Sequence, residues 1–186
     1  KKMPNKLFVI SGASGVGKST VLAKVMSERT DLRFSVSATT RNIRPGEVDG
    51  ESYYFITKDK FLDMIEKHEF LEYDAHMDNC YGTPKGQLEE KLQTGSVILD
   101  IEPNGAFNVR KEKDDAVLIF IAPPSLEELE RRLRSRGDTS EEQIAVRQAR
   151  VAWEMEQSKQ YDYVVVNDVV ERCAAEILEI IAREAN

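Results

Sequence analysis

Cysteine is scarce in this sequence, and long apolar runs are missing. The 186 residues include two cysteines, Cys80 and Cys173, which stand far apart and in no pairing motif. A disulfide scaffold is thereby excluded, and two reduced thiols are expected. No run approaches the roughly 20 apolar residues of a membrane span. The polar residues 1–6 lead directly into a predicted strand rather than into the apolar centre of a signal peptide. We therefore expect a cytoplasmic protein without a membrane partner.

Positive charge is also in deficit. The chain carries 26 Lys and Arg against 33 Asp and Glu, a formal net charge of −7. A general nucleic-acid binder normally has the opposite sign, so no nucleic-acid partner is expected. Any polyanion must be met by a local basic cluster. The length fits one compact domain with smaller inserted lobes, and the sequence leaves monomer and homodimer equally open.

Short apolar runs alternate with longer segments of helical periodicity. The expected strands are 6–11, 33–36, 96–101, 116–122 and 163–166, and the expected helices are 18–29, one beginning at Ser125, and 171–184. Apolar strands that alternate with helices are typical of a parallel sheet covered on both faces. The sequence therefore predicts a three-layer α/β fold, with 163–166 as a further buried strand.

Two segments interrupt this alternation. Residues 37–84 are rich in aromatic and turn residues, with a helix expected at 58–67, and predict a small mixed α/β lobe. Residues 131–157 are highly charged and helical, and they are typical of a mobile flap rather than of core. Within them, Ser140 precedes Gln143 by three positions, which predicts a capping box. The remaining ranges, 1–36, 85–130 and 158–186, are assigned to the core.

A glycine-rich loop follows the first predicted strand and opens the first predicted helix. It matches the P-loop pattern at every fixed position. Its backbone N–H groups can surround phosphate oxygens, Lys18 can reach the β- and γ-phosphates, and the Ser19 hydroxyl can bind Mg²⁺. The alternative is a strand–helix turn without a ligand. We expect the triphosphate contacts at Gly12, Ala13, Ser14, Gly15, Val16, Gly17, Lys18, Ser19 and Thr20.

Asp100 ends the apolar strand 97–99. In P-loop enzymes a second acidic residue near Mg²⁺ commonly stands at such a strand end. The alternative is a strand-end carboxylate that is hydrogen-bonded to a neighbouring helix. We assign the metal contacts to Ser19 and Asp100, in part through water.

Residues 37–50, SATTRNIRPGEVDG, closely resemble the signature of guanylate kinases. The likeness continues through Tyr53, residues 69–72, 81–83, 99–105, the arginines of the flap and residues 166–168, so it covers nearly the whole chain. This resemblance implies a P-loop NTPase core with an inserted GMP-binding lobe at 37–84 and a helical lid at 131–157. It also implies Mg²⁺-assisted transfer of a phosphoryl group from ATP to GMP, in purine nucleotide metabolism and GMP recycling.

The acceptor lobe contains groups suited to a nucleoside monophosphate. Two arginines near a turn and two tyrosine hydroxyls suit a phosphate monoester, although a solvated basic turn is the alternative. A carboxylate accepts from both N1–H and N2–H of guanine, and hydroxyls complete the ring contacts. The expected phosphate contacts are Arg41, Arg44, Tyr53 and Tyr81, and the expected base-reading residues are Ser37, Glu72 and Thr83.

The turn after the strand at 97–100 departs from the family pattern. Asp, a variable residue and Gln commonly precede the glycine in that family, whereas this chain has Glu102, Pro103 and Asn104 before Gly105. The resemblance still implies that Asp100 and Glu102 contact GMP. Cys80 replaces an expected aromatic residue before Tyr81, which predicts altered packing rather than altered chemistry.

The flap carries several arginines. Arg132, Arg136 and Arg147 match the arginines that kinases of this family bring over the transferring phosphoryl group, so they join Lys18 as expected catalytic residues. Arg131, Arg134 and Arg150 are additional charges, some of them simply solvated by helical periodicity, and they are not placed in the site. The alternative for the whole cluster is an amphipathic helix with salt bridges to Glu127, Glu128 and Glu130. The resemblance also implies that Asn167 and Asp168 lie near the adenine of ATP.

Three other functions compete with this interpretation. A phosphopeptide-binding relative would typically lack P-loop or lid residues, which are present here. A kinase of sugar phosphates would lack the set of Ser37, Glu72 and Thr83. A P-loop GTPase would need an Asn-Lys-x-Asp segment, which the sequence does not contain.

Overall fold

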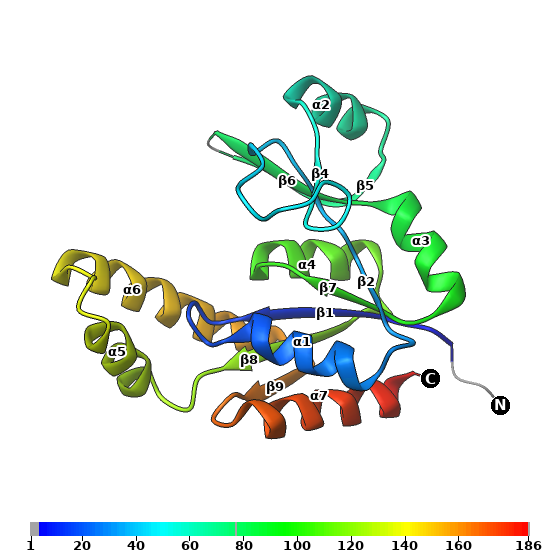
Figure 1. The fold of residues 1–186 in the computed structure, drawn as a ribbon. Helices are drawn as coiled ribbons and strands as arrows, with labels where there is room; N and C mark the ends of the chain where they lie inside the picture. The colour runs from blue at the N-terminus through cyan, green and yellow to red at the C-terminus, as the bar shows by residue number, and fades with distance from the viewer. Residues whose placement is uncertain (1–3, 77, 186) are drawn as a thin grey trace.

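The structure is a computed structural model, and it describes residues 4–76 and 78–185 (Figure 1). The residues 1–3, 77 and 186, which fall within the predicted core and acceptor lobe, lie outside the described residues. A parallel sheet in the order β2-β7-β1-β8-β9 forms its centre. Its strands are β1 (Leu7–Gly12), β2 (Arg33–Phe34), β7 (Val97–Asp100), β8 (Val117–Ala122) and β9 (Tyr163–Val166).

Helices cover both faces of this sheet, as the continuous apolar strands predict. The helices α1 (Lys18–Glu28) and α7 (Val170–Glu184) pack against each other on one face, and α4 (Pro103–Glu112) lies on the other (Figure 1). Residues 7–10 of β1 and 118–121 of β8 are fully buried. The predicted three-layer fold is confirmed, and its carboxyl edge gathers the ends of β1, β7 and β8.

A second, smaller sheet stands above the first (Figure 1). Its order is β4-β3-β6-β5, and it is mixed because β3 pairs with β4 in parallel and with β6 antiparallel. Its elements are β3 (Ala38–Thr39), β4 (Tyr54–Phe55), α2 (Lys58–Glu66), β5 (Phe70–His76) and β6 (Asn79–Pro84), and α3 (Lys85–Thr94) leads back to the large sheet. A separate apolar cluster supports it, in which the rings of Phe61 and Phe70 lie 4.5 Å apart.

Two helices form an arm beside the large sheet (Figure 1). The first, α5 (Leu126–Ser135), begins where the Ser125 hydroxyl accepts a hydrogen bond from the Glu128 N–H. The second, α6 (Glu141–Gln157), begins with the predicted capping box of Ser140 and Gln143 and runs into the short helix η1 (Ser158–Gln160). Val151 of α6 is buried in the main core. The second half of α6 is thus anchored in the core, and the assignment of residues 131–157 to a mobile lid stays a prediction.

The last strand differs from its prediction as a buried strand. Val165 is buried, but Val164 and Val166 are 48% and 44% exposed. The reason is its place in the sheet: β9 is an edge strand, and side chains alternate between the two faces of a strand. An apolar run of this length does not reveal whether the strand will be central or at an edge. β2, at the opposite edge, is also exposed, and it is shorter than the predicted strand at 33–36.

Candidate active site

The loop between β1 and α1 has the backbone geometry of a phosphate cradle. Gly15 and Gly17 have φ angles of 78° and 84°, a region that glycine adopts without steric cost. The Ala13 N–H donates to the Ile121 carbonyl of β8 over 3.1 Å, which ties the loop to the sheet. The helix α1 begins at Lys18 with Ser19 and Thr20 exposed in its first turn. The loop and a helix N-terminus together suit an anion.

Asn167 lies behind this loop and is 6% exposed. Its side-chain N–H donates to the Val16 carbonyl over 2.7 Å, whereas its Oδ1 accepts from no group among the described residues. Asp168 instead pairs with Arg172 at 2.8 Å and accepts from the Val169 N–H at the start of α7. Of this predicted pair, Asn167 therefore contacts the loop and Asp168 faces solvent.

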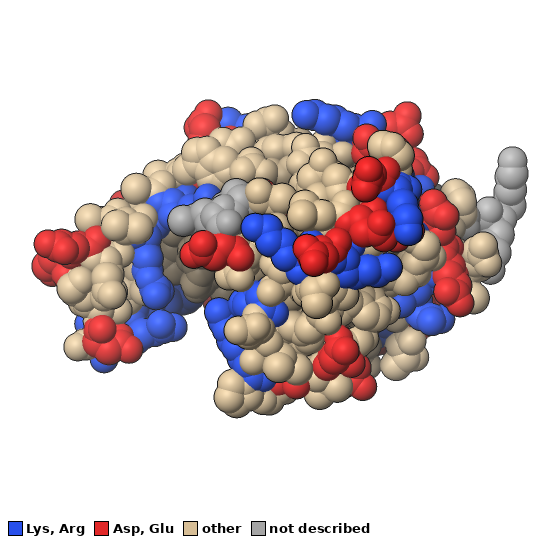
Figure 2. Space-filling view, turned by 90° about the horizontal axis from the view of Figure 1, so that it is seen from above, with Lys and Arg blue, Asp and Glu red and all other residues tan. Residues whose placement is uncertain are grey.

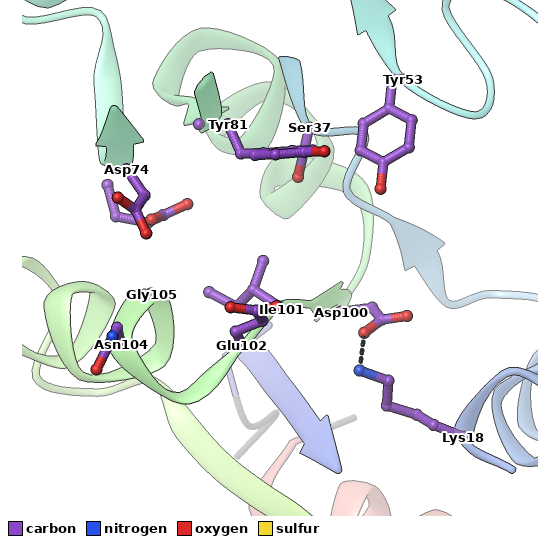
Figure 3. Close-up of a pocket in the computed structure, with 12 residues that line it drawn as sticks. Lys18, Ser37, Tyr53, Asp74, Tyr81, Asp100, Ile101, Glu102, Asn104 and Gly105 are labelled. Atoms are coloured by element: carbon purple, nitrogen blue, oxygen red, sulfur yellow. Dashed lines mark ion pairs between the residues drawn. The ribbon is translucent and has the colours of Figure 1, made fainter. Parts of the chain in front are cut away.

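Lys18 forms an ion pair with Asp100 across the carboxyl ends of two neighbouring strands (Figure 3). Asp100 is aligned with Ile10 of β1 in the parallel register, so its position follows from the strand order β7-β1. Both side chains are partly exposed, at 23% for Lys18 and 30% for Asp100. The Lys18 ammonium thus has an anionic partner in the described structure, at the place where phosphate oxygens would approach.

A pocket of about 390 Å³ opens between the two sheets, with Lys18 and Asp100 at one end. Figure 3 shows the Tyr53 hydroxyl directed from the small lobe into this space, above the ion pair. Of the predicted acceptor residues, the pocket brings together Ser37, Tyr53, Glu72, Tyr81, Asp100 and Glu102, and it adds Asp74, Gly82, Ile101, Asn104 and Gly105. Asp74 could have been found from the sequence, because it stands two positions after Glu72 on the same strand face.

Glu72 is the buried carboxylate of this pocket, at 8% exposure. The Thr83 hydroxyl donates to its Oε1 over 2.8 Å, so Thr83 stands behind Glu72 rather than on the pocket wall. Burial raises the pKa of Glu72, the Thr83 hydrogen bond opposes that shift, and Asp74 adds to it. A Cβ on Gly105 of α4 would lie 3.1 Å from Glu72 Oε2. The absence of a side chain at this position therefore leaves space for the Glu72 carboxylate.

Arg41 is not among the residues that line the pocket, and it is held by a bidentate ion pair. Its two terminal nitrogens meet the two oxygens of Glu47 at 2.8 and 2.9 Å, and its guanidinium lies 5.2 Å from the Tyr53 ring centroid. The ion pair with Arg41 lowers the pKa of Glu47 to about 2. Glu47 also accepts from the backbone N–H of Arg44, whose own side chain is not on the pocket wall. The sequence interpretation did not include Glu47.

The predicted lid arginines lie outside the acceptor pocket. Arg132 pairs with Glu128 on its own helix at 3.3 Å, and Arg136 is the C-cap residue that follows α5. Arg147 lines a separate cavity of about 340 Å³ between α5 and α6. Arg150, which the sequence interpretation did not place in the site, reaches the turn after β7, where it contacts Glu102 at 3.4 Å. The helix α5 therefore has salt bridges to Glu128 and Glu130, as expected for a charged amphipathic helix. The helix α6 makes the contact between Arg150 and Glu102.

Basic side chains gather locally despite the negative net charge. Figure 2 shows Lys and Arg on both sides of a notch between the helical arm and the body of the molecule. Such a local concentration of cations can meet a polyanion although the net charge is negative. Among the described residues, no group of three or more His, Cys, Asp or Glu could hold a metal by itself.

A parallel α/β sheet, a P-loop and a second sheet that closes a polar pocket define a P-loop nucleotide kinase. The profile of the family described as Guanylate kinase matches residues 4–184. Over 185 residues the chain is 49% identical to the guanylate kinase of Thermus thermophilus, spanning 99% of this chain and 82% of that protein. It is 46% identical to that of Clostridioides difficile over 97% and 88% of the two chains. The chain therefore belongs to the guanylate kinase family.

The fold agrees with a solved relative. The crystal structure of guanylate kinase from Anaplasma phagocytophilum superposes with a TM-score of 0.78 at 34% identity, covering 98% of this chain and 87% of that one. In the part of the chain that the structure describes, no helix is long and apolar enough to cross a membrane.

Proposed function

We propose that this chain phosphorylates GMP with ATP, giving ADP and GDP, in purine nucleotide metabolism and GMP recycling. The observation that carries the proposal is one pocket that has Glu72 of the small sheet at one end and the ion pair between Lys18 of the P-loop and Asp100 of β7 at the other. A phosphate oxygen of GMP attacks the γ-phosphorus of ATP, and the bond from that phosphorus to the bridging oxygen of ADP breaks. Catalysis then consists mainly of alignment and charge neutralisation.

The guanine base is read by Glu72. Its ionised carboxylate accepts from N1–H and N2–H, and Ser37 lies on the same pocket wall. Thr83 acts by holding Oε1 of Glu72 in place. Adenine would direct its N1 lone pair at this carboxylate, and a buried mismatch of that kind can discriminate by about 10⁴. Asp100 and Glu102 contribute further contacts from the opposite wall.

The acceptor phosphate is bound by Arg41, Arg44, Tyr53 and Tyr81. Glu47 holds the Arg41 fork in the orientation that a phosphate also requires, since both anions present paired oxygens. Arg44 comes from the neighbouring turn.

The donor nucleotide lies on the P-loop, from Gly12 to Thr20. Lys18 exchanges its contact with Asp100 for phosphate oxygens. Asn167 offers the adenine amino group its side-chain oxygen, which has no partner among the described residues. Asp168 stands beside it at the start of α7.

Mg²⁺ fits this site as an oxygen-bound ion. The Ser19 hydroxyl and the Asp100 carboxylate are hard oxygen donors, and Mg²⁺ usually combines one or two such groups with water and substrate phosphates rather than with an all-protein cluster. When bound, the ion neutralises phosphate charge. Ser19 and Asp100 would hold it.

The lid at 131–157 closes over the bound nucleotides separately from the acceptor lobe at 37–84, while the end of α6 that carries Val151 stays packed in the core. This motion brings Arg132, Arg136 and Arg147 to the transferring group and excludes water. The protein acts in the cytoplasm, as a monomer or homodimer, without nucleic acid or membrane.

A coupled assay of ADP release tests this function, with GMP, AMP, CMP and UMP as acceptors in parallel. We expect turnover with GMP to dominate. Turnover with AMP equal to that with GMP would contradict the assignment. Absence of turnover with all four would instead favour the phosphopeptide-binding alternative.

A further inference from the structure

We propose that Glu154 is a positioning residue of this kinase, which holds the P-loop from the lid helix α6 and so sets the donor-phosphate cradle. The inference rests on the proposed function, because the cradle it concerns is that of ATP. Glu154 stands near the end of α6, 140 positions after the loop residue that it contacts.

The contact is a pair of hydrogen bonds to one carboxylate oxygen. Both the backbone N–H and the hydroxyl of Ser14 donate to Glu154 Oε1, over 3.1 and 2.9 Å. Glu154 is 4% exposed. A carboxylate is costly to bury unless donors compensate it, and hydrogen bonds to a charged group are stronger than neutral ones. The two donors of Ser14 supply that compensation at Oε1.

The second oxygen of Glu154 faces Arg150, one turn earlier on α6. The Arg150 Nε lies 3.8 Å from Glu154 Oε2, and its guanidinium lies over the Trp153 ring, 4.6 Å from the centroid. Arg150 also contacts Glu102 on the acceptor side. One face of α6 therefore touches the donor loop through Glu154 and the acceptor turn through Arg150.

The loop is then held at two points by side chains from distant segments. Glu154 fixes the Ser14 N–H, and Asn167 fixes the Val16 carbonyl at 2.7 Å. Between them stands Gly15, with its positive φ of 78°. Backbone N–H groups stabilise phosphate charge best when their directions are set before the ligand arrives. Glu154 thus acts on ATP through Ser14 and contributes nothing directly to GMP binding.

The test compares Glu154→Gln and Glu154→Ala with Glu156→Gln on the full chain. Glu156 is an exposed neighbour that pairs only with Lys159 among the described contacts, so it is a matched control. Calorimetric titration with a non-hydrolysable ATP analogue and Mg²⁺, without GMP, gives the dissociation constant. Steady-state assays give the KM values for ATP and GMP separately. Trp153, the single tryptophan, reports through its emission whether α6 keeps its place.

We expect Glu154→Gln to weaken binding of the ATP analogue, raising its dissociation constant about tenfold. The GMP KM should stay within about twofold of the parent value, and the Trp153 emission should not change. Glu154→Ala should weaken it further, and Glu156→Gln should not change it. A rise of less than about threefold in the dissociation constant of the ATP analogue, in both Glu154 variants, overturns the proposal. So does an equal loss for ATP and GMP that follows the melting temperature, because that pattern marks general destabilisation.

A double variant separates the contact from the rest of the helix. If Glu154 acts through Ser14, the effects of Ser14→Ala and Glu154→Gln on ATP binding combine to less than their product, whereas independent effects multiply and overturn the proposal. The calorimetric titration needs no turnover. Failure of GMP phosphorylation in the parent protein would thus contradict the proposed function while leaving the Ser14–Glu154 link separately measured.

Discussion

The Thr83 hydroxyl donates a hydrogen bond of 2.8 Å to Oε1 of the buried Glu72 carboxylate. Without it, this oxygen would lose a hydrogen-bond donor. The two residues oppose each other on the antiparallel strands β5 and β6, so the sheet register itself sets the contact. The Thr83 hydroxyl thereby orients the carboxylate that we propose reads the guanine base.

Glu72→Gln should raise the KM for GMP roughly tenfold to a hundredfold, because the amide replaces an acceptor with a donor that faces the donors of guanine. The KM for ATP should stay within about twofold. Glu69→Gln, on the same segment outside the pocket, is the control. Initial rates at varied GMP and saturating ATP check this expectation, and an unchanged GMP KM would contradict the base-reading scheme.

The same substitution should alter the pH dependence of stability. The folded state raises the pKa of Glu72 above its ordinary value of 4.5, so the unfolded chain binds fewer protons than the folded one between these two values. Stability contributed by this group therefore falls as pH rises through that window. Chemical denaturation from pH 4.5 to 8 should show the stability of Glu72→Gln, relative to the parent, increasing with pH. A pH-independent difference would refute the direction of the shift.

Lys18→Ala should lower kcat by about 10²–10³ while the GMP KM changes little, because a charge aimed at the transferring phosphoryl group acts mainly in the transition state. Lys24→Ala provides the comparison on the same helix, where Lys24 pairs with Glu28 at the surface. Initial rates at saturating ATP and varied GMP give both kcat and the GMP KM. A loss confined to the GMP KM would place Lys18 on the wrong substrate.

Arg41→Lys should raise the GMP KM roughly tenfold, since an ammonium replaces a planar fork that meets two oxygens at once. Arg29→Lys is the matched change at the ion pair with Asp31, outside both pockets. Measuring the GMP KM of both variants tests this expectation. Equal values would show that the fork geometry of Arg41 has no role in phosphate binding.

Arg147→Ala should lower kcat by about a hundredfold or more and leave the melting temperature within a few degrees, because the lid arginine is needed only when the lid closes. Arg131→Ala, which removes an exposed arginine paired with Glu128, should retain activity. Rate and melting measurements on both variants test the contrast. Equal activity of the two would assign Arg147 to the helix surface alone.

Local sequence was sufficient wherever the determining residues are consecutive. The P-loop, the capping box of Ser140 and the alternation of strands and helices depend on neighbours in the chain, and the structure has each of them. The membership in the guanylate kinase family is likewise carried by motifs in a fixed order. These features are set by backbone preferences and by side-chain periodicity, which a single segment contains.

Tertiary structure decided the features that join distant segments. The exposure of β9 follows from its edge position, which no local pattern records. Glu154 and Arg150 share one face of α6, but their spacing does not show whether this face meets solvent or protein. The packing of α6 beside the P-loop brings Glu154 to Ser14 and Arg150 to Glu102. Helical spacing determines which side chains lie together, whereas strand order and packing determine what they meet.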